Sequence, residues 1–229
     1  MCNLYSMTKT TAAITHLFRV PHNRAQAYEP LPAIFPGWAA PVVRMAADGE
    51  RELVSMSWGF VLLQDGKAPR RVTNTRDDKV RSRFWRTSFE QRRCLVPASS
   101  FCEPHDGRKP ATWHWFALKG DEPRPAFAFA GLWQRWNGPV KKGGENVELE
   151  VYSFMTTVPN SATSSNNHER SPVLLTTDHD RDRWLLGTPD EAAAVIAPIA
   201  GDTLTIVQEG FEKRDLLGWQ AASPAGPSL

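Results

Sequence analysis

The sequence predicts an α+β fold in which a twisted, barrel-like antiparallel sheet forms the core and a few helices flank it. Many short runs rich in β-branched and aromatic residues follow one another, and few segments have helical spacing. The 229 residues are 41% apolar and 23% charged, which is typical of one good-sized globular domain. We expect this single domain to span residues 1–218 and residues 219–229 to form a disordered tail.

The clearest predicted strand is 147–158, where apolar residues alternate with Glu148 and Glu150. Residues 29–45 are rich in proline and predict a loop that closes into a strand, and KKGGEN at 141–146 predicts a hairpin loop. The other expected strands are runs of strand length bounded by turn residues, at 53–58, 71–74, 94–101, 112–118, 126–133, 172–176 and 203–208.

Helices are expected at fewer places. Residues 77–91 have an amphipathic pattern, and residues 8–18 have a weaker one. A helix over 179–187 would end at Gly187, and one over 188–197 would begin with a capping box formed by Thr188 and Glu191.

The composition and motifs argue against several classes of protein. No apolar run approaches the ~18 residues of a membrane span, and we expect no secretory signal. The three cysteines form no disulfide framework, so we expect a reduced, cytoplasmic protein. Cys102 and His105 have metal-like spacing but no second pair, and no phosphate or dinucleotide motif is present, so we expect no metal and no cofactor.

Positive charge gathers in one stretch of the chain. Residues 70–93 hold nine Lys or Arg against three Asp or Glu, although the net charge of the whole chain is only +2. Such a cluster is either a solvated surface or a patch that contacts the phosphates of a nucleic acid.

Four short segments carry residues suited to chemistry, and together they resemble one family. They are Cys2 behind the initiator Met1, NTRDD at 74–78, PASSFCEP at 97–104 and HERSP at 168–172. In this order they resemble the SRAP (SOS response-associated peptidase) family, whose members are abasic-site processing proteins. The resemblance covers about residues 1–210 and implies the SRAP fold and a single-stranded DNA substrate that contains abasic sites.

The resemblance implies that Cys2 captures the ring-opened aldehyde of an abasic site once Met1 is removed. Its α-amine would form an imine and its thiol would close a thiazolidine ring, and the resemblance also implies strand-cleaving lyase activity and reversal of the crosslink. The reference pKa values of ~8 for the amine and ~8.5 for the thiol predict that both are partly deprotonated at neutral pH. Ring closure is favoured because one residue carries both nucleophiles.

The other motif residues have matching predicted roles. Glu103 is expected to shuttle protons, Asn74 to orient the amine or the opened sugar, and His168 to protonate the sugar oxygen and promote β-elimination. Arg76 and Arg170, together with Arg83 from the same basic stretch as Arg76, are expected to contact DNA phosphates.

The sequence departs from the family pattern at several positions. Asn3 and Leu4 stand where Gly-Arg is usual, Asp78 replaces a Glu, and Pro104 replaces a Trp. The segment after Gly59 lacks the usual loop rich in Pro and Trp. These changes predict an altered DNA-holding surface.

Two alternative functions remain open. The first is an autoproteolytic peptidase that uses Cys2 as an N-terminal nucleophile. The second is a noncatalytic module that binds single-stranded DNA. In each case we expect a monomer without membrane contact.

Overall fold

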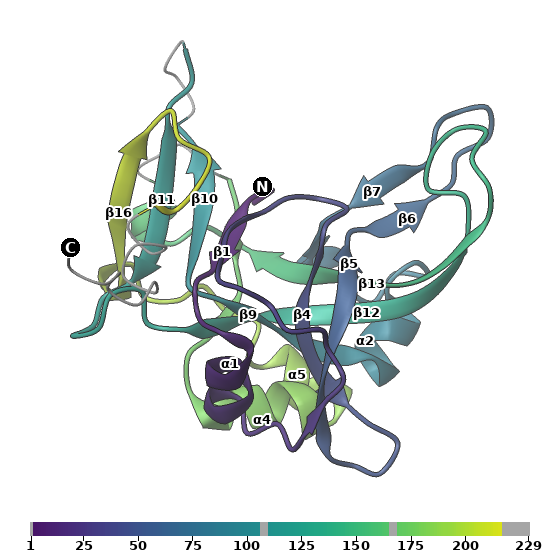
Figure 1. The fold of residues 1–229 in the computed structure, drawn as a ribbon, viewed down its shortest axis with the longest axis horizontal. Coiled ribbons are helices and arrows are strands. Elements are labelled where there is room, and N and C mark those ends of the chain that lie inside the picture. The colour runs from purple at the N-terminus through teal and green to yellow at the C-terminus, as the bar shows by residue number, and fades with distance from the viewer. Residues whose placement is uncertain (1, 106–109, 165–168, 217–229) are drawn as a thin grey trace, which may run out of the picture.

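The computed structural model describes residues 2–105, 110–164 and 169–216, and its core is a closed five-stranded barrel. The strand order is β13-β12-β9-β4-β5, and β5 pairs back onto β13 in parallel, whereas the other neighbours are antiparallel. The barrel strands are β4 (Ala39–Met45), β5 (Arg51–Trp58), β9 (Arg93–Ala98), β12 (Phe127–Gly138) and β13 (Val147–Thr157). The predicted α+β fold with a barrel-like sheet is therefore confirmed (Figure 1).

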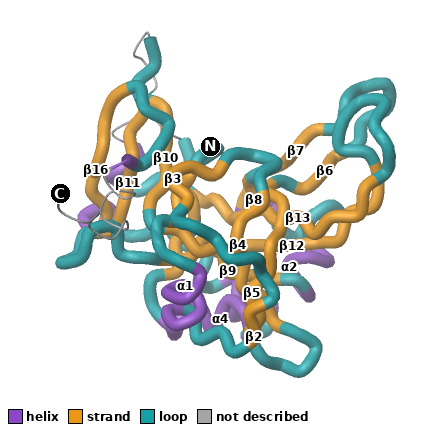
Figure 2. The backbone as a smooth tube through the Cα atoms, in the orientation of Figure 1, coloured by secondary structure: helices purple, strands orange, loops and turns teal. Residues whose placement is uncertain are grey.

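A second sheet stands beside the barrel (Figure 2). Its order is β16-β11-β10-β1-β3, with β1 (Tyr5–Met7), β3 (Leu31–Ile34), β10 (Ser100–Pro104), β11 (Trp113–Leu118) and β16 (Leu204–Gly210). A separate hairpin consists of β6 (Phe60–Leu62) and β7 (Arg70–Val72). Short strands that pair with the barrel are β2 (His22–Asn23), β8 (Asn74–Arg76), β14 (Ser171–Pro172) and β15 (Leu174–Leu175).

The helices are short, and several lie together below the barrel in Figure 1. They are α1 (Thr11–Leu17), α2 (Arg86–Gln91), α3 (Ser161–Ser164), α4 (Asp178–Leu186) and α5 (Pro189–Ala193), with 3₁₀ turns η1 (Asp77–Lys79) and η2 (Gly201–Thr203). The capping box of Thr188 and Glu191 begins α5 as predicted. Within the described ranges, no helix has the length and apolar character to cross a membrane.

The predicted helix over 77–91 is wrong over its first part. Only Asp77–Lys79 and Arg86–Gln91 are helical, and turns connect them. The buried residues Val80 and Trp85 are five positions apart, a spacing that does not put two side chains on one helix face. The ring of Trp85 packs 4.8 Å from that of Phe60, so the segment follows the core instead of a regular helix.

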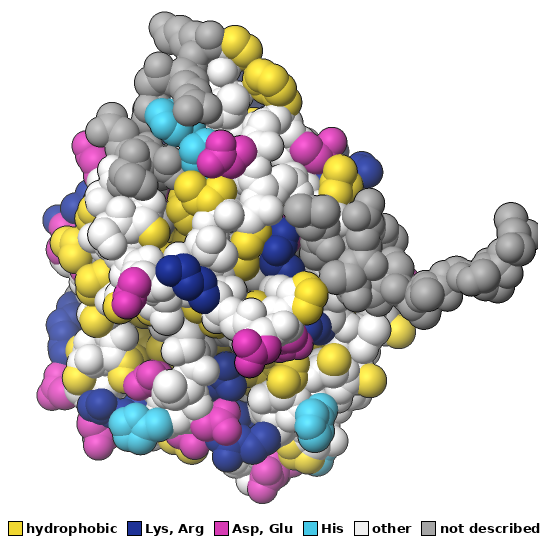
Figure 3. Space-filling view, turned by 90° about the vertical axis from the view of Figure 1, so that its left-hand side faces the viewer, with side chains coloured by type: hydrophobic (Ala, Val, Ile, Leu, Met, Phe, Trp, Pro, Cys, Tyr) yellow, Lys and Arg dark blue, Asp and Glu magenta, His cyan; other side chains and the backbone are white. Residues whose placement is uncertain are grey.

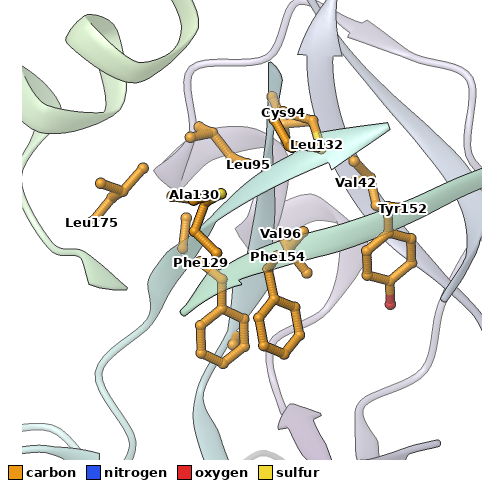
Figure 4. Packing of buried hydrophobic residues seen from close by; sticks show 14 of the residues in the cluster. Val42, Cys94, Leu95, Val96, Phe129, Ala130, Leu132, Tyr152, Phe154 and Leu175 are labelled. Atoms are coloured by element: carbon orange, nitrogen blue, oxygen red, sulfur yellow. The ribbon is translucent and has the colours of Figure 1, made fainter. Parts of the chain in front are cut away.

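Tyr5, in the second sheet, packs against aromatic side chains of the barrel. Its ring lies 5.1 Å from Trp58 and 5.6 Å from Phe129, in edge-on geometry. Phe129 in turn stacks on Phe154 at 4.3 Å, as the neighbouring rings in Figure 4 show. Aromatic pairs in such geometry add about 1 kcal/mol each to their apolar burial. Strand β1 is thereby fixed against the barrel (Figure 1).

Candidate active site

The segment before β1 fixes the position of Cys2. The backbone N–H of Cys102 donates to the carbonyl of Leu4 at 2.8 Å, and Tyr5 pairs with Phe101 of β10. Cys2 itself is buried, with 1% of its surface exposed. A side chain at the start of a chain is usually mobile unless contacts restrain it, and here the second sheet and the barrel both do so.

Asn74 contacts Cys2 directly. It begins β8, which pairs with β13 of the barrel, and its Nδ2 donates to the Cys2 carbonyl at 2.7 Å and to Thr73 Oγ1 at 2.9 Å. Thr73 donates in turn to Asn3 Oδ1 at 2.8 Å. The Oδ1 of Asn74 is buried and accepts no hydrogen bond from the described residues, so it is an acceptor beside Cys2.

Glu103 is the acidic group next to Cys2. It lies near the end of β10 with 1% of its surface exposed, and its negative charge acts on the Cys2 thiol. Burial raises the pKa of this thiol far above its ordinary value, and the charge of Glu103 raises it further. The prediction that the thiol is partly deprotonated at neutral pH is therefore wrong: a base must take its proton before it can react.

Arg170, in the HERSP segment at 168–172, contacts the segment that carries Asn74. His168 lies outside the described residues, but Arg170, two positions later, is ion-paired with Asp77. Its Nε also donates to Thr156 Oγ1 at 3.1 Å. The segments around Asn74 and after His168 thus lie side by side, and Arg170 is held by a carboxylate of the protein itself.

The Asp77–Arg170 pair predicts a pH-dependent contribution to stability. Burial alone would raise the pKa of Asp77, but hydrogen bonds from Thr157 and Arg170 outweigh it and lower the pKa. A carboxyl with a lowered pKa stabilises the fold above the unfolded value of ~3.9, and this contribution is lost as the pH falls through the lowered pKa. We expect Asp77→Asn to lower the free energy of unfolding by about 1–2 kcal/mol at pH 7.

Urea unfolding at several pH values measures this effect. The difference between Asp77→Asn and the wild type should shrink as the pH falls below ~3.9. Asp78→Asn is the matched control, because Asp78 forms an exposed pair with Arg76 and should change the stability less. A difference that stays constant over this pH range would contradict the assignment.

The remaining predicted DNA contacts lie on the surface. Arg76 is exposed and donates twice to Asp78, at 2.9 Å each, and Arg83 is exposed. Several other cations of the 70–93 stretch bind the protein itself: Arg71 donates to the carbonyl of Gly59 and Arg93 to that of Trp184. Some of the positively charged side chains in residues 70–93 therefore bind the protein itself, and others are exposed to solvent.

The structure shows the surroundings of two residues that depart from the family pattern, Leu4 and Pro104. Leu4 is buried against Ala33, Cys102 and Trp115. Pro104 pairs with Trp113 across the β10–β11 ladder, so an aromatic side chain still lies at this end of the sheet. Cys94 is buried in the barrel core.

The sequence reasoning missed His114. It pairs with Glu103 across the two strands, and its ring lies 5.1 Å from that of His105. The available signal was a single titratable residue inside the apolar run TWHWFAL. Such a residue on a buried strand needs a polar partner, and the hairpin places a carboxylate opposite it.

Comparisons with known proteins identify relatives of this chain. Two Bacillus subtilis (strain 168) proteins named "Abasic site processing protein" are similar to this chain. YoqW is 28% identical over 174 residues, which cover 73% of this chain and 74% of YoqW. YoaM is 25% identical over 183 residues, which cover 73% of each chain.

Solved structures share the fold. A protein from Bacteroides thetaiotaomicron superposes with a TM-score of 0.69 at 20% identity, covering 97% of each chain. A protein from Bordetella bronchiseptica has the same TM-score at 19% identity and covers 91% of this chain and 98% of its own. The family model "SOS response associated peptidase (SRAP)" matches residues 1–209. The chain therefore belongs to the SRAP family.

Proposed function

We propose that this protein processes abasic sites in single-stranded DNA by forming a thiazolidine crosslink through Cys2 after Met1 is removed. The observation that carries the proposal is the convergence of Cys2, Asn74 and Glu103 from three separate segments at one buried place. The names of the Bacillus relatives support the same substrate.

The residues can carry the reaction with balanced proton transfers. Glu103 takes a proton from the α-ammonium group of Cys2, and the free amine adds to the aldehyde of the opened sugar. The Glu103 carboxyl then protonates the hydroxyl of the adduct, which leaves as water as the C=N bond forms. Sulfur attacks the iminium carbon while the thiol proton passes to Glu103, which closes the ring.

The high pKa of the Cys2 thiol fits this order of events. A thiol that stays protonated does not react with other electrophiles, and it loses its proton only when the iminium carbon and the Glu103 carboxylate are both in place. The Oδ1 of Asn74, which accepts no hydrogen bond from the described residues, can accept one from the amine and so orient it towards the aldehyde.

Further parts of the proposal concern DNA and the cell. His168 would protonate the sugar oxygen and support lyase activity and crosslink reversal. Arg76, Arg83 and Arg170 would contact phosphates, with DNA competing against Asp78 and Asp77 for two of them. We place the protein in the cytoplasm as a monomer, where thiols stay reduced.

Denaturing electrophoresis after mixing with an abasic single-stranded oligonucleotide tests the function. The wild type should give a persistent protein–DNA band, and Cys2→Ser should give none, because its hydroxyl replaces the ring-closing thiol. Cys102→Ser is the matched control, since its thiol is also buried beside the site but lies within β10. Intact mass spectrometry must first show loss of Met1. Absence of the band from processed wild-type protein contradicts the proposal and favours a noncatalytic module.

A further inference from the structure

Three side chains form a row across the second sheet, and Glu103 is one of them. Glu103 of β10 pairs directly with His114 of β11, and His114 pairs directly with Glu209 of β16. Directly opposed residues of antiparallel strands point to the same face, with Cβ atoms about 5 Å apart. The row is therefore carboxylate, imidazole, carboxylate.

Burial changes along this row from the interior to the surface. Glu103 and His114 are 1% and 3% exposed, whereas the Glu209 side chain is 55% exposed. His114 Nε2 lies 3.9 Å from Glu209 Oε2. On the side of the molecule shown in Figure 3, His side chains (cyan) lie next to acidic side chains (magenta) near the top of the view.

The surroundings of His114 leave its ring nitrogens available. Both are buried, and neither makes a hydrogen bond to any residue that the structure describes. Among the described residues, the polar groups that face the ring are Glu103, Glu209 and the imidazole of His105. The next pair along the same face is the apolar stack of Phe101 and Phe116. A buried imidazole whose nitrogens make no hydrogen bond within the described residues is unfavourable for folding, so its presence here calls for a role.

The proposed chemistry creates a need for such a group. The α-ammonium group and the thiol of Cys2 together carry four protons; the thiazolidine nitrogen keeps one and the departing water takes two, so each crosslink leaves one proton on Glu103. A carboxyl that is 1% exposed has no direct route to water for this proton. Reversal of the crosslink needs the same proton to return.

We propose that His114 is the positioning residue that links Glu103 to solvent through Glu209. The imidazole accepts the proton of Glu103 on one nitrogen and releases a proton from the other to Glu209, which passes it to water. No bond other than those to hydrogen changes. This inference rests on the proposed function, since it assigns the route by which that reaction's proton leaves.

The kinetic test compares His114→Gln and His114→Ala with the wild type in single-turnover crosslinking. We expect both variants to form the crosslink at least about tenfold more slowly, and to reverse it more slowly by the same factor, because both directions use one path. Affinity for undamaged single-stranded DNA and the thermal midpoint report on structure and should change little. Added imidazole should restore part of the rate of His114→Ala, and Glu209→Gln should slow the reaction less than either. His179→Gln is the matched control, since that ring is exposed on α4.

Two outcomes overturn the inference. The first is that a His114 variant crosslinks at the wild-type rate. The second is that the crosslinking rate and the DNA affinity fall together and added imidazole does not restore the rate, which would indicate that His114 is purely structural. A second measurement needs no DNA: the ring nitrogen signals of His114 in NMR spectra should shift in Glu103→Gln and in Glu209→Gln. If the wild type forms no crosslink but these signals shift, the proposed function fails and the coupled row stands. If the signals do not shift, the row itself is refuted.

Discussion

Glu103→Gln is expected to slow crosslink formation by about 10²- to 10⁴-fold, the usual loss when a general acid–base is removed. Glutamine keeps the shape of the side chain, but it cannot take the proton of the α-ammonium group or of the Cys2 thiol. The burial of Glu103 and its action on that thiol make it the described acidic group best placed for both transfers. The measurement is the single-turnover rate constant with an abasic single-stranded oligonucleotide.

The pH dependence of the variant gives a second check. Removing the charge of Glu103 lowers the pKa of the Cys2 thiol, although burial still holds it above its ordinary value. The residual rate of Glu103→Gln should therefore rise as the pH is raised, because the thiolate fraction then grows without help from a base. Glu90→Gln, on the exposed side of α2, is the control and should react as the wild type does. An unchanged rate in Glu103→Gln would remove Glu103 from the mechanism.

Features determined by neighbouring residues were predictable from the sequence. The alternation around Glu148 and Glu150 gave β13, and the capping box at Thr188 gave the start of α5. Features determined by distant contacts were not. The predicted strand 94–101 is in fact two strands, because the chain leaves the barrel at Ser99 and enters the second sheet. The change of sheet falls at Ser99 and Ser100, and two polar residues within an apolar run do not by themselves predict it.

The candidate site was also predictable only in part from the sequence. The motif series predicted Cys2, Asn74 and Glu103, and the structure brings these three together. The state of the Cys2 thiol was mispredicted, because a reference pKa takes no account of burial or of a nearby carboxylate. His114 was missed because its link to Glu103 depends on strand register, which two segments separated by a loop do not reveal.

A buried ion pair fixes the second sheet, and Asp215→Asn is expected to lower the free energy of unfolding by about 3–5 kcal/mol. The Asp215 carboxylate is fully buried and accepts two hydrogen bonds from Arg124, at 2.7 and 2.9 Å. Ser100 of β10 also donates to it at 2.6 Å. Asparagine has nearly the same volume but no charge, so the substitution leaves the buried guanidinium of Arg124 without compensation.

Chemical unfolding of matched variants tests this interpretation. Asp202→Asn is the control, since Asp202 is exposed in η2 and its loss should change the stability by less than about 0.5 kcal/mol. Arg124→Gln should also destabilise the fold, and the double variant should lose less than the sum of the two single losses, because each alone leaves one charge buried. Strictly additive losses would show that the two side chains act independently. Ser100 lies three residues before Glu103 on β10, so weakening the Asp215–Arg124 pair should also slow crosslinking. The chemistry at Cys2 would then depend on the stability of the second sheet.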